Sequence, residues 1–212
     1  MKPAKENIIK RRIIAIGKKL IDCRLVTARA GNLSARLDAK SILITVTGSE
    51  LGNLKYSDIV KVSLENGVLA KTKRKPSSEL PAHGSIYKNF PCQVVIHCHP
   101  PLTNAYFAVL PRLKVLTFET RFYLKEVPVV AQKSLNVTRV DKLIAALRKN
   151  KIAVVKNHGV FSIADTFSQA LGPILILEEA IKVAAIARLF KKKALDKIDR
   201  QIKKCLLNPK AG

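Results

Sequence analysis

The sequence predicts an α/β protein in which a sheet lies between helices. Segments with helical periodicity alternate with short runs of β-branched residues, and Gly, Pro, Asn and Asp mark the turns between them. The chain has 212 residues, 48% of them hydrophobic, which is enough for a sizeable core and too much for disorder. No internal repeat or low-complexity linker divides it, so we expect a single domain over residues 1–212.

The N-terminal part predicts one helix and two hairpins. Residues 5–24 carry isoleucines and leucines at helical spacing, so we expect an amphipathic helix there. Residues 31–48 predict two strands joined by a short turn. A second hairpin is expected over residues 58–72, because the Asn66-Gly67 pair accepts the positive φ angles of a tight turn.

The middle of the chain predicts a helix, a strand and a second helix. Residues 76–89 are expected to form a helix with Ser77 or Ser78 as its N-cap, because short hydroxyl side chains accept hydrogen bonds from the first free N–H groups. The β-branched run at residues 92–98 predicts a buried strand, and residues 102–110 predict a short helix.

The C-terminal part adds strands and helices to the same plan. Residues 127–131 predict a strand and residues 140–149 a helix. Residues 152–163 predict a pair of strands broken at residues 157–159, where the sequence Asn-His-Gly favours a turn. One long helix is expected over residues 164–193, which an internal Gly-Pro pair could interrupt.

The formal net charge of +24 is the most unusual property of the composition. Such a charge is compatible with binding nucleic acid, an anionic membrane surface or an anionic substrate. It is concentrated in the N-terminal helix, in residues 71–75 and in residues 188–204, which include a basic tail from about residue 191. The sequence has no RNA-binding aromatic motif, zinc-finger spacing or helix-turn-helix signal, so we favour a solvated cationic surface over nucleic-acid binding.

The N-terminus and the cysteines indicate a cytoplasmic protein. The first residues, MKPAKENIIKRR, lack the apolar segment of a secretory signal, and no apolar stretch is long enough to span a membrane. Cys23, Cys92, Cys98 and Cys205 form no CxxC pair and lie in apolar surroundings, so we expect reduced thiols.

Three histidines suggest a metal site. His97 and His99 are two apart at the end of a predicted strand, so they share one face of the sheet, while Cys98 faces the opposite side. His158 follows a second buried strand, and three histidines with an open fourth position are a common catalytic zinc arrangement. Two strand histidines could equally be hydrogen-bonded core residues, and nothing local determines how close His158 lies to them.

The stretch KPSSELPAHG adds a carboxylate and an anion site. Glu79 and His83 are four residues apart and share a helix face. Ser77, Ser78 and the free N–H groups of the helix start would suit an anion. The alternative is an ordinary capped helix with an acidic first turn. The Thr-Gly-Ser at residues 47–49 would by itself predict only a turn.

Together these motifs resemble one family, the class II aldolase/adducin family of the L-fuculose-phosphate aldolase type. The resemblance extends from about residue 8 to about residue 190. It rests on five motifs in order: Gly31-Asn32-x-Ser34, Thr47-Gly48, Ser77-Ser78-Glu79 with His83, His97-x-His99 and Asn157-His158-Gly159.

The resemblance implies an α/β/α domain with a central, mainly antiparallel sheet, and a homotetramer with active sites at subunit interfaces. It implies one Zn²⁺ per subunit on His97, His99 and His158, with Glu79 as the catalytic acid/base. Adducin-like members with structural roles have lost zinc histidines, whereas this chain keeps all three. The implied activity is a zinc-dependent lyase that cleaves or forms a C–C bond in a small phosphorylated ketose, with dihydroxyacetone phosphate and an aldehyde as products.

The resemblance also implies a site for the substrate phosphate and the oxygens next to it. That site would consist of Asn32, Thr47, Gly48, Ser77 and Ser78.

The chain departs from the aldolase pattern in the region that distinguishes substrates. The aldolase tyrosine that protonates an oxygen downstream of the HxH strand falls at Phe118, while Tyr106 and Tyr123 do not match its spacing. The aldolase's C-terminal tyrosine has no counterpart. The related 4-epimerase has aspartate in place of Glu79 and a second aspartate near Thr120. Methylthioribulose-1-phosphate dehydratase, sugar-phosphate 4-epimerase, decarboxylase and non-catalytic adducin-like roles therefore stay open as alternatives.

Overall fold

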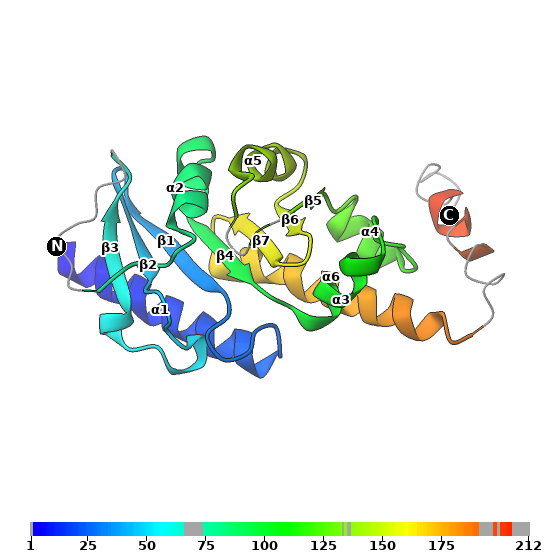
Figure 1. The fold of residues 1–212 in the computed structure, drawn as a ribbon, viewed down its shortest axis with the longest axis horizontal. Coiled ribbons are helices and arrows are strands. Elements are labelled where there is room, and N and C mark those ends of the chain that lie inside the picture. Colours follow the sequence, from blue (N-terminus) through cyan, green and yellow to red (C-terminus); the bar gives the residue numbers. More distant parts are fainter. Residues whose placement is uncertain are drawn as a thin grey trace.

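A computed structural model describes residues 2–65, 74–132, 134, 137–190, 197–198 and 200–204 of the chain. Within this part, one seven-stranded sheet carries helices on both of its faces (Figure 1). Only the pairing of the last two strands in the sheet order is parallel, and every other pairing is antiparallel. The predicted α/β fold with a mainly antiparallel central sheet is confirmed.

The strand order places three strand ends at one edge of the sheet. The order is β3-β2-β1-β4-β7-β6-β5. In the central strands, Asn32 of β1 lies opposite His97 of β4, and Cys98 of β4 lies opposite Val160 of β7. The start of β1, the end of β4 and the start of β7 therefore meet. The strands are β1 (Asn32–Asp38), β2 (Ser41–Thr45), β3 (Ile59–Ser63), β4 (Val94–Cys98), β5 (Val129–Val130), β6 (Ile152–Val155) and β7 (Gly159–Ala164).

Two hydrophobic cores lie on the two faces of the sheet. Alternate β4 residues divide between them: Val94, Ile96 and Cys98 pack in one core, and Val95 packs in the other. The prediction that Cys98 faces the side of the sheet opposite to His97 is therefore confirmed, because Cys98 packs in the first core and the His97 ring stacks on Phe161 of the second. The first core is covered by α1 (Lys2–Asp22), α3 (Pro101–Val109), α4 (Phe118–Leu124) and α6 (Phe167–Ala187), and the second by α2 (Leu80–Asn89) and α5 (Val140–Lys149) (Figure 1).

Helix α2 begins later than predicted. It starts at Leu80 with Glu79 at the N-cap position, so the prediction that Ser77 or Ser78 caps it is wrong. The preceding residues are held extended against the end of β2, because Pro76 forms a bridge with Val46 and the Ser77 N–H donates to a β2 carbonyl. Pairing with a distant strand thus overrides the local preference for a longer helix.

Three further features of the fold differ from the sequence prediction: an additional helix, an unbroken long helix and two short 3₁₀ helices. Helix α4 has no counterpart in that prediction; Thr117 caps it by accepting a hydrogen bond from the Thr120 N–H. Helix α6 runs through Pro173 without a break. Two short 3₁₀ helices, η1 (Leu51–Asn53) and η2 (Tyr56–Asp58), follow β2. The Asn66-Gly67 turn, the second strand of that hairpin and much of the basic tail lie outside the described residues.

No helix in the described ranges combines the length and the hydrophobicity that crossing a bilayer requires.

The packing of α1 predicts opposite effects for two glycine-to-alanine changes. A Cβ atom at Gly17 would collide with the Leu51 carbonyl of η1, whereas a Cβ at Gly84 of α2 would meet no atom within 4 Å. Gly84→Ala should raise the free energy of unfolding by about 0.5–1 kcal/mol through helix propensity. Gly17→Ala should lower it by about 1–3 kcal/mol, because overpacking outweighs that gain. Denaturant unfolding measures both, and a stabilised Gly17→Ala variant would contradict the tight contact between α1 and η1.

Candidate functional site

The meeting point of the central strands is a cavity of about 230 Å³. Its wall is formed by the start of β1, the residues after β2, the turn before α2, the end of β4 and the turn between β6 and β7. The predicted site residues all line it: Asn32, Thr47, Gly48, Ser77, Ser78, Glu79, His97, His99 and His158. The fold thus brings these residues together from five separate segments, while the role of each stays a prediction.

The three histidines point their ring nitrogens at one another. The His97 Nε2 atom lies 2.9 Å from the His99 Nε2 and 3.0 Å from the His158 Nε2. His97 donates its Nδ1–H to the Val160 carbonyl at 2.9 Å, which leaves the Nε2 lone pair free to face the other two rings. An ordinary core histidine pairs its ring nitrogens with carbonyls or hydroxyls, so this convergence favours a metal site over the core alternative.

Burial favours the neutral form of two of these imidazoles, those of His97 and His99. It lowers the pKa of His97 well below the usual range, with the neighbouring histidines as further causes. Burial likewise lowers the pKa of His99 to about 4, with His158 adding to the effect. Neutral imidazole is the form that coordinates a metal, and a site of three imidazoles suits Zn²⁺ among other transition metals. The residues present therefore fit the predicted group, although they do not select one metal.

Two glycines allow the turns of the site to approach this closely. A Cβ atom at Gly159 would collide with the Cys98 carbonyl and lie 2.7 Å from the His99 ring. Gly31 has a φ of 80°, and a Cβ there would lie 2.7 Å from the His97 carbonyl oxygen. Side chains at these two positions would push the β1 and β7 turns away from β4.

Helix α3 makes hydrogen bonds that hold the segments carrying His99 and His158. The sequence did not predict these contacts. Glu178 of α6 accepts hydrogen bonds from the N–H groups of Leu102 and Thr103 and from the Thr103 hydroxyl. This carboxylate ties the start of α3, just after His99, to the long helix. Asn104 of α3 donates its amide N–H to the His158 carbonyl at 3.2 Å.

Glu79 lies beside the histidine cluster. Its Oε1 atom is 3.8 Å from the His158 Nε2 and accepts the Val137 N–H at 3.3 Å. The side chain is buried, and this burial raises the pKa of the carboxyl while the Val137 hydrogen bond opposes the shift. A carboxyl group with a raised pKa next to a cavity suits proton transfer.

The polar part of the cavity wall differs from the predicted anion site in one respect. The Glu79 N–H is bonded to the Ser77 hydroxyl and the Leu80 N–H to the Ser77 carbonyl, so the start of α2 offers fewer free N–H groups than expected. Gly48, with a φ of 76° and no atom near its missing side chain, leaves open space in the wall. Arg29 also lines the cavity and was not predicted.

The tyrosines considered from the sequence do not line this cavity. The Tyr106 hydroxyl accepts the Lys114 N–H, and Tyr123 is exposed on α4. Phe118, at the position that the family resemblance assigns to tyrosine, is 55% exposed at the start of α4. The cavity walls within the described part of the chain therefore contribute no phenol.

Comparisons with known proteins identify the family to which this chain is similar. The sequence profile of the family described as "Class II Aldolase and Adducin N-terminal domain" matches residues 11–185. An L-fuculose phosphate aldolase of Methanocaldococcus jannaschii is 30% identical over 184 residues, which cover 86% of this chain and 99% of the relative. A 3-oxo-tetronate 4-phosphate decarboxylase of Pectobacterium atrosepticum is 30% identical over 181 residues, or 82% of each chain.

A solved structure supports the same fold. The crystal structure of L-fuculose-1-phosphate aldolase from Thermus thermophilus matches with a TM-score of 0.77 and 29% sequence identity. The match covers 88% of this chain and 96% of that chain.

The convergence of the imidazoles predicts that metal binding needs all three. Replacing His97, His99 or His158 by alanine should remove most of the metal that the wild type retains after dialysis, because two imidazoles bind far more weakly than three. His83→Gln, which changes the fourth histidine, is the matched control and should keep its metal. Atomic absorption measures metal per chain, and full retention by His158→Ala would show that the site is wrongly assembled.

Proposed function

Since this chain belongs to the class II aldolase and adducin family, we propose that it is a metal-dependent lyase acting on a small phosphorylated ketose. In the direction of cleavage, the bond breaks between C3, the carbon next to the carbonyl, and C4, which carries a hydroxyl. The products are dihydroxyacetone phosphate and an aldehyde. The observation that carries the proposal is the buried Glu79 carboxyl, 3.8 Å from the His158 Nε2 of the three-imidazole cluster, in a cavity that hydroxyl and amide side chains also line.

In this proposal His97, His99 and His158 hold one Zn²⁺ per subunit. When bound, the metal withdraws electron density from the carbonyl oxygen of the ketose. The His97–Val160 hydrogen bond fixes the tautomer that presents Nε2 to the site, and the Asn104–His158 contact holds the turn that presents His158.

Glu79 then moves the proton. When the C–C bond breaks, the C4 hydroxyl loses its proton to solvent and becomes the aldehyde, the electron pair stays on the ketone fragment, and its carbon takes a proton from the Glu79 carboxyl. In the synthetic direction the carboxylate removes that proton again. The raised pKa of Glu79 supports this role, because the group must be able to hold a proton in the cavity.

The phosphate of the substrate is bound in this proposal by Asn32, Thr47, Gly48, Ser77 and Ser78. The Asn32 amide, the Ser77 and Ser78 hydroxyls and the Gly48 N–H are neutral donors, which suit a dianion. The Thr47 hydroxyl donates to the Pro76 carbonyl and would contribute to the shape of the subsite. Arg29 adds a cation at the same cavity; its side chain is 70% exposed and 3.9 Å from Glu50, so it stays available to a ligand from solvent.

Decarboxylation of a 3-oxo acid phosphate is the second candidate, favoured by the lack of a phenol among the described residues that line the cavity. Cleavage of a ketose requires a base that takes the proton of the C4 hydroxyl as it becomes the aldehyde, the same group acts as the acid for the aldehyde oxygen in synthesis, and the corresponding position is Phe118. Loss of CO₂ requires no such group: the C–C bond electrons stay on the ketone fragment, and Glu79 protonates that carbon. The Pectobacterium relative is named for such a reaction.

We also propose a cytoplasmic homotetramer with its active sites at subunit interfaces. Exposed apolar side chains gather on α4 and beyond the end of α6, and helix α4 carries Phe122 with 69% of its surface exposed. Exposed aromatic groups of this kind are typical of an interface. The members of this apolar surface are Phe118, Phe122, Tyr123, Leu189 and Phe190.

The proton-transfer role of Glu79 predicts hydrogen exchange without an aldehyde. Wild-type protein should exchange a C3 hydrogen of dihydroxyacetone phosphate with solvent deuterium, as measured by proton NMR. Glu79→Gln keeps the shape of the side chain but cannot take the proton, so exchange should slow by about 10²–10⁴-fold with metal and fold retained. Exchange at the wild-type rate would make Glu79 a structural carboxylate.

The same assay separates the two reactions. Both predict the exchange, but only an aldolase forms a condensation product when aldehydes are added. Release of CO₂ from a 3-oxo acid phosphate without condensation would favour the decarboxylase.

The apolar surface predicts a change of assembly in a charged variant. Sedimentation of the wild type at moderate salt should give about four times the chain mass, because burial of this surface offsets the repulsion between cationic copies. Phe122→Glu should dissociate the assembly, whereas Tyr56→Glu, at an exposed tyrosine on η2, should not. A wild-type monomer would contradict the proposed tetramer.

A further inference from the structure

His83 is the histidine that the proposed chemistry does not use. It is fully buried on α2 and is not among the residues that line the cavity. Its ring nevertheless makes two short hydrogen bonds, with Nε2 at 2.6 Å from the Asn32 Oδ1 and Nδ1 at 2.6 Å from the Ser34 Oγ. The Ser34 Oγ lies 2.9 Å from the Tyr87 hydroxyl. A hydrogen-bonded chain therefore runs from the core to the cavity wall.

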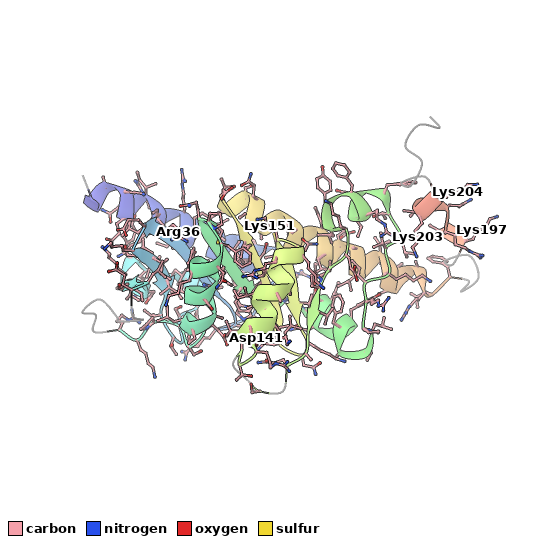
Figure 2. All side chains as sticks on the ribbon, turned by 90° about the horizontal axis from the view of Figure 1, so that it is seen from above. Arg36, Asp141, Lys151, Lys197, Lys203 and Lys204 are labelled. Atoms are coloured by element: carbon pink, nitrogen blue, oxygen red, sulfur yellow. The ribbon has the colours of Figure 1, made fainter. Side chains whose placement is uncertain are left out.

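This series of hydrogen bonds follows from the residue spacing on the strand β1 and on the helix α2. Asn32 and Ser34 are two apart on β1 and share a face, while His83 and Tyr87 are four apart on α2 and share a face. Arg36, which is labelled in Figure 2, is the next residue on the same face of β1. It donates to the Tyr87 and Phe90 carbonyls at the end of α2. The helix is thus fastened to the strand along its length.

One arrangement of the hydrogen atoms along this series of hydrogen bonds provides a donor to the Asn32 carbonyl. Burial lowers the pKa of His83 to about 3, so the ring is neutral and carries a single N–H. The Asn32 Oδ1 only accepts, so that hydrogen is on Nε2, and Nδ1 accepts the hydroxyl hydrogen of Ser34. Ser34 in turn accepts from the Tyr87 hydroxyl. Each buried group then has a partner.

The consequence appears at the cavity end of this chain. With its oxygen held by His83, the Asn32 amide can present only its NH₂ group to the cavity that it lines. Among the described residues, no hydrogen bond occupies that nitrogen. A flipped amide would present its carbonyl oxygen instead, which repels an anion.

We propose that His83 is a positioning residue that holds the Asn32 amide with its N–H groups toward the substrate phosphate. This rests on the proposed phosphate subsite, and it assigns His83, Ser34 and Tyr87 a part in substrate recognition although none of them touches substrate. It also explains why a polar side chain is buried at this point: a side chain without an N–H group there would leave the amide free to rotate.

The test measures the binding of inorganic phosphate to metal-loaded protein by calorimetry. His83→Leu removes the donor to Asn32 and should weaken phosphate binding about tenfold, as Asn32→Ala should. His83→Gln offers an amide N–H near the position of Nε2 and should recover most of the affinity. The double variant should bind no more weakly than Asn32→Ala alone, because His83 acts through Asn32.

Two outcomes overturn the proposal while leaving the lyase reaction intact. One is phosphate binding by His83→Leu equal to that of the wild type. The other is a loss of phosphate-binding free energy in the double variant that equals the sum of the losses in His83→Leu and Asn32→Ala. Wild-type protein that binds no phosphate would instead refute the phosphate subsite of the proposed function.

A measurement on the wild type tests the proposal even if a His83 variant fails to fold. Nitrogen-15 NMR of histidine-labelled protein should show His83 as the neutral Nε2–H tautomer, unchanged between about pH 8 and pH 5. The Nδ1–H tautomer would reverse the hydrogen-bonded chain and overturn the proposed orientation of Asn32.

Discussion

The candidate site depends on the hydrogen-bonded register of β4 between β1 and β7. That register sets Asn32 opposite His97 and Val160 opposite Cys98, so the ends of three strands coincide at one edge of the sheet. A shift of one residue in either pairing would turn His97 into the opposite core and would separate His158 from it. The two glycines at the strand ends maintain this register, because larger residues there would collide with the β4 backbone.

Desolvation acts on the two kinds of titratable group in the cavity with opposite signs. It lowers the pKa of His97 and His99 and raises the pKa of Glu79, so it favours neutral imidazoles beside a carboxyl that can hold a proton. In the proposed mechanism, the same burial leaves the imidazoles able to bind a cation and leaves Glu79 able to donate a proton to the substrate carbon. The large positive charge of the chain is mostly elsewhere; Lys197, Lys203 and Lys204 lie beyond the end of α6 (Figure 2).

The supporting residues of the site belong to the helices rather than to the strands. Glu178 of α6 holds the start of α3, Asn104 of α3 holds the His158 turn, and His83 of α2 holds Asn32. Each contact joins residues that are 51 or more positions apart in the chain. The two helical layers therefore orient the side chains that the sheet brings together.

The sequence by itself determined the elements and the chemical inventory of the site. Hydrophobic periodicity predicted most helices and strands, and the spacing of His97 and His99 predicted their shared face, because both signals depend on neighbours along the chain. Only the tertiary structure decided that His158 reaches them, that α2 starts at Leu80, and that His83 fixes Asn32. These facts follow from strand order, register and the packing of α2 on β1, which join residues distant in sequence and leave no local pattern.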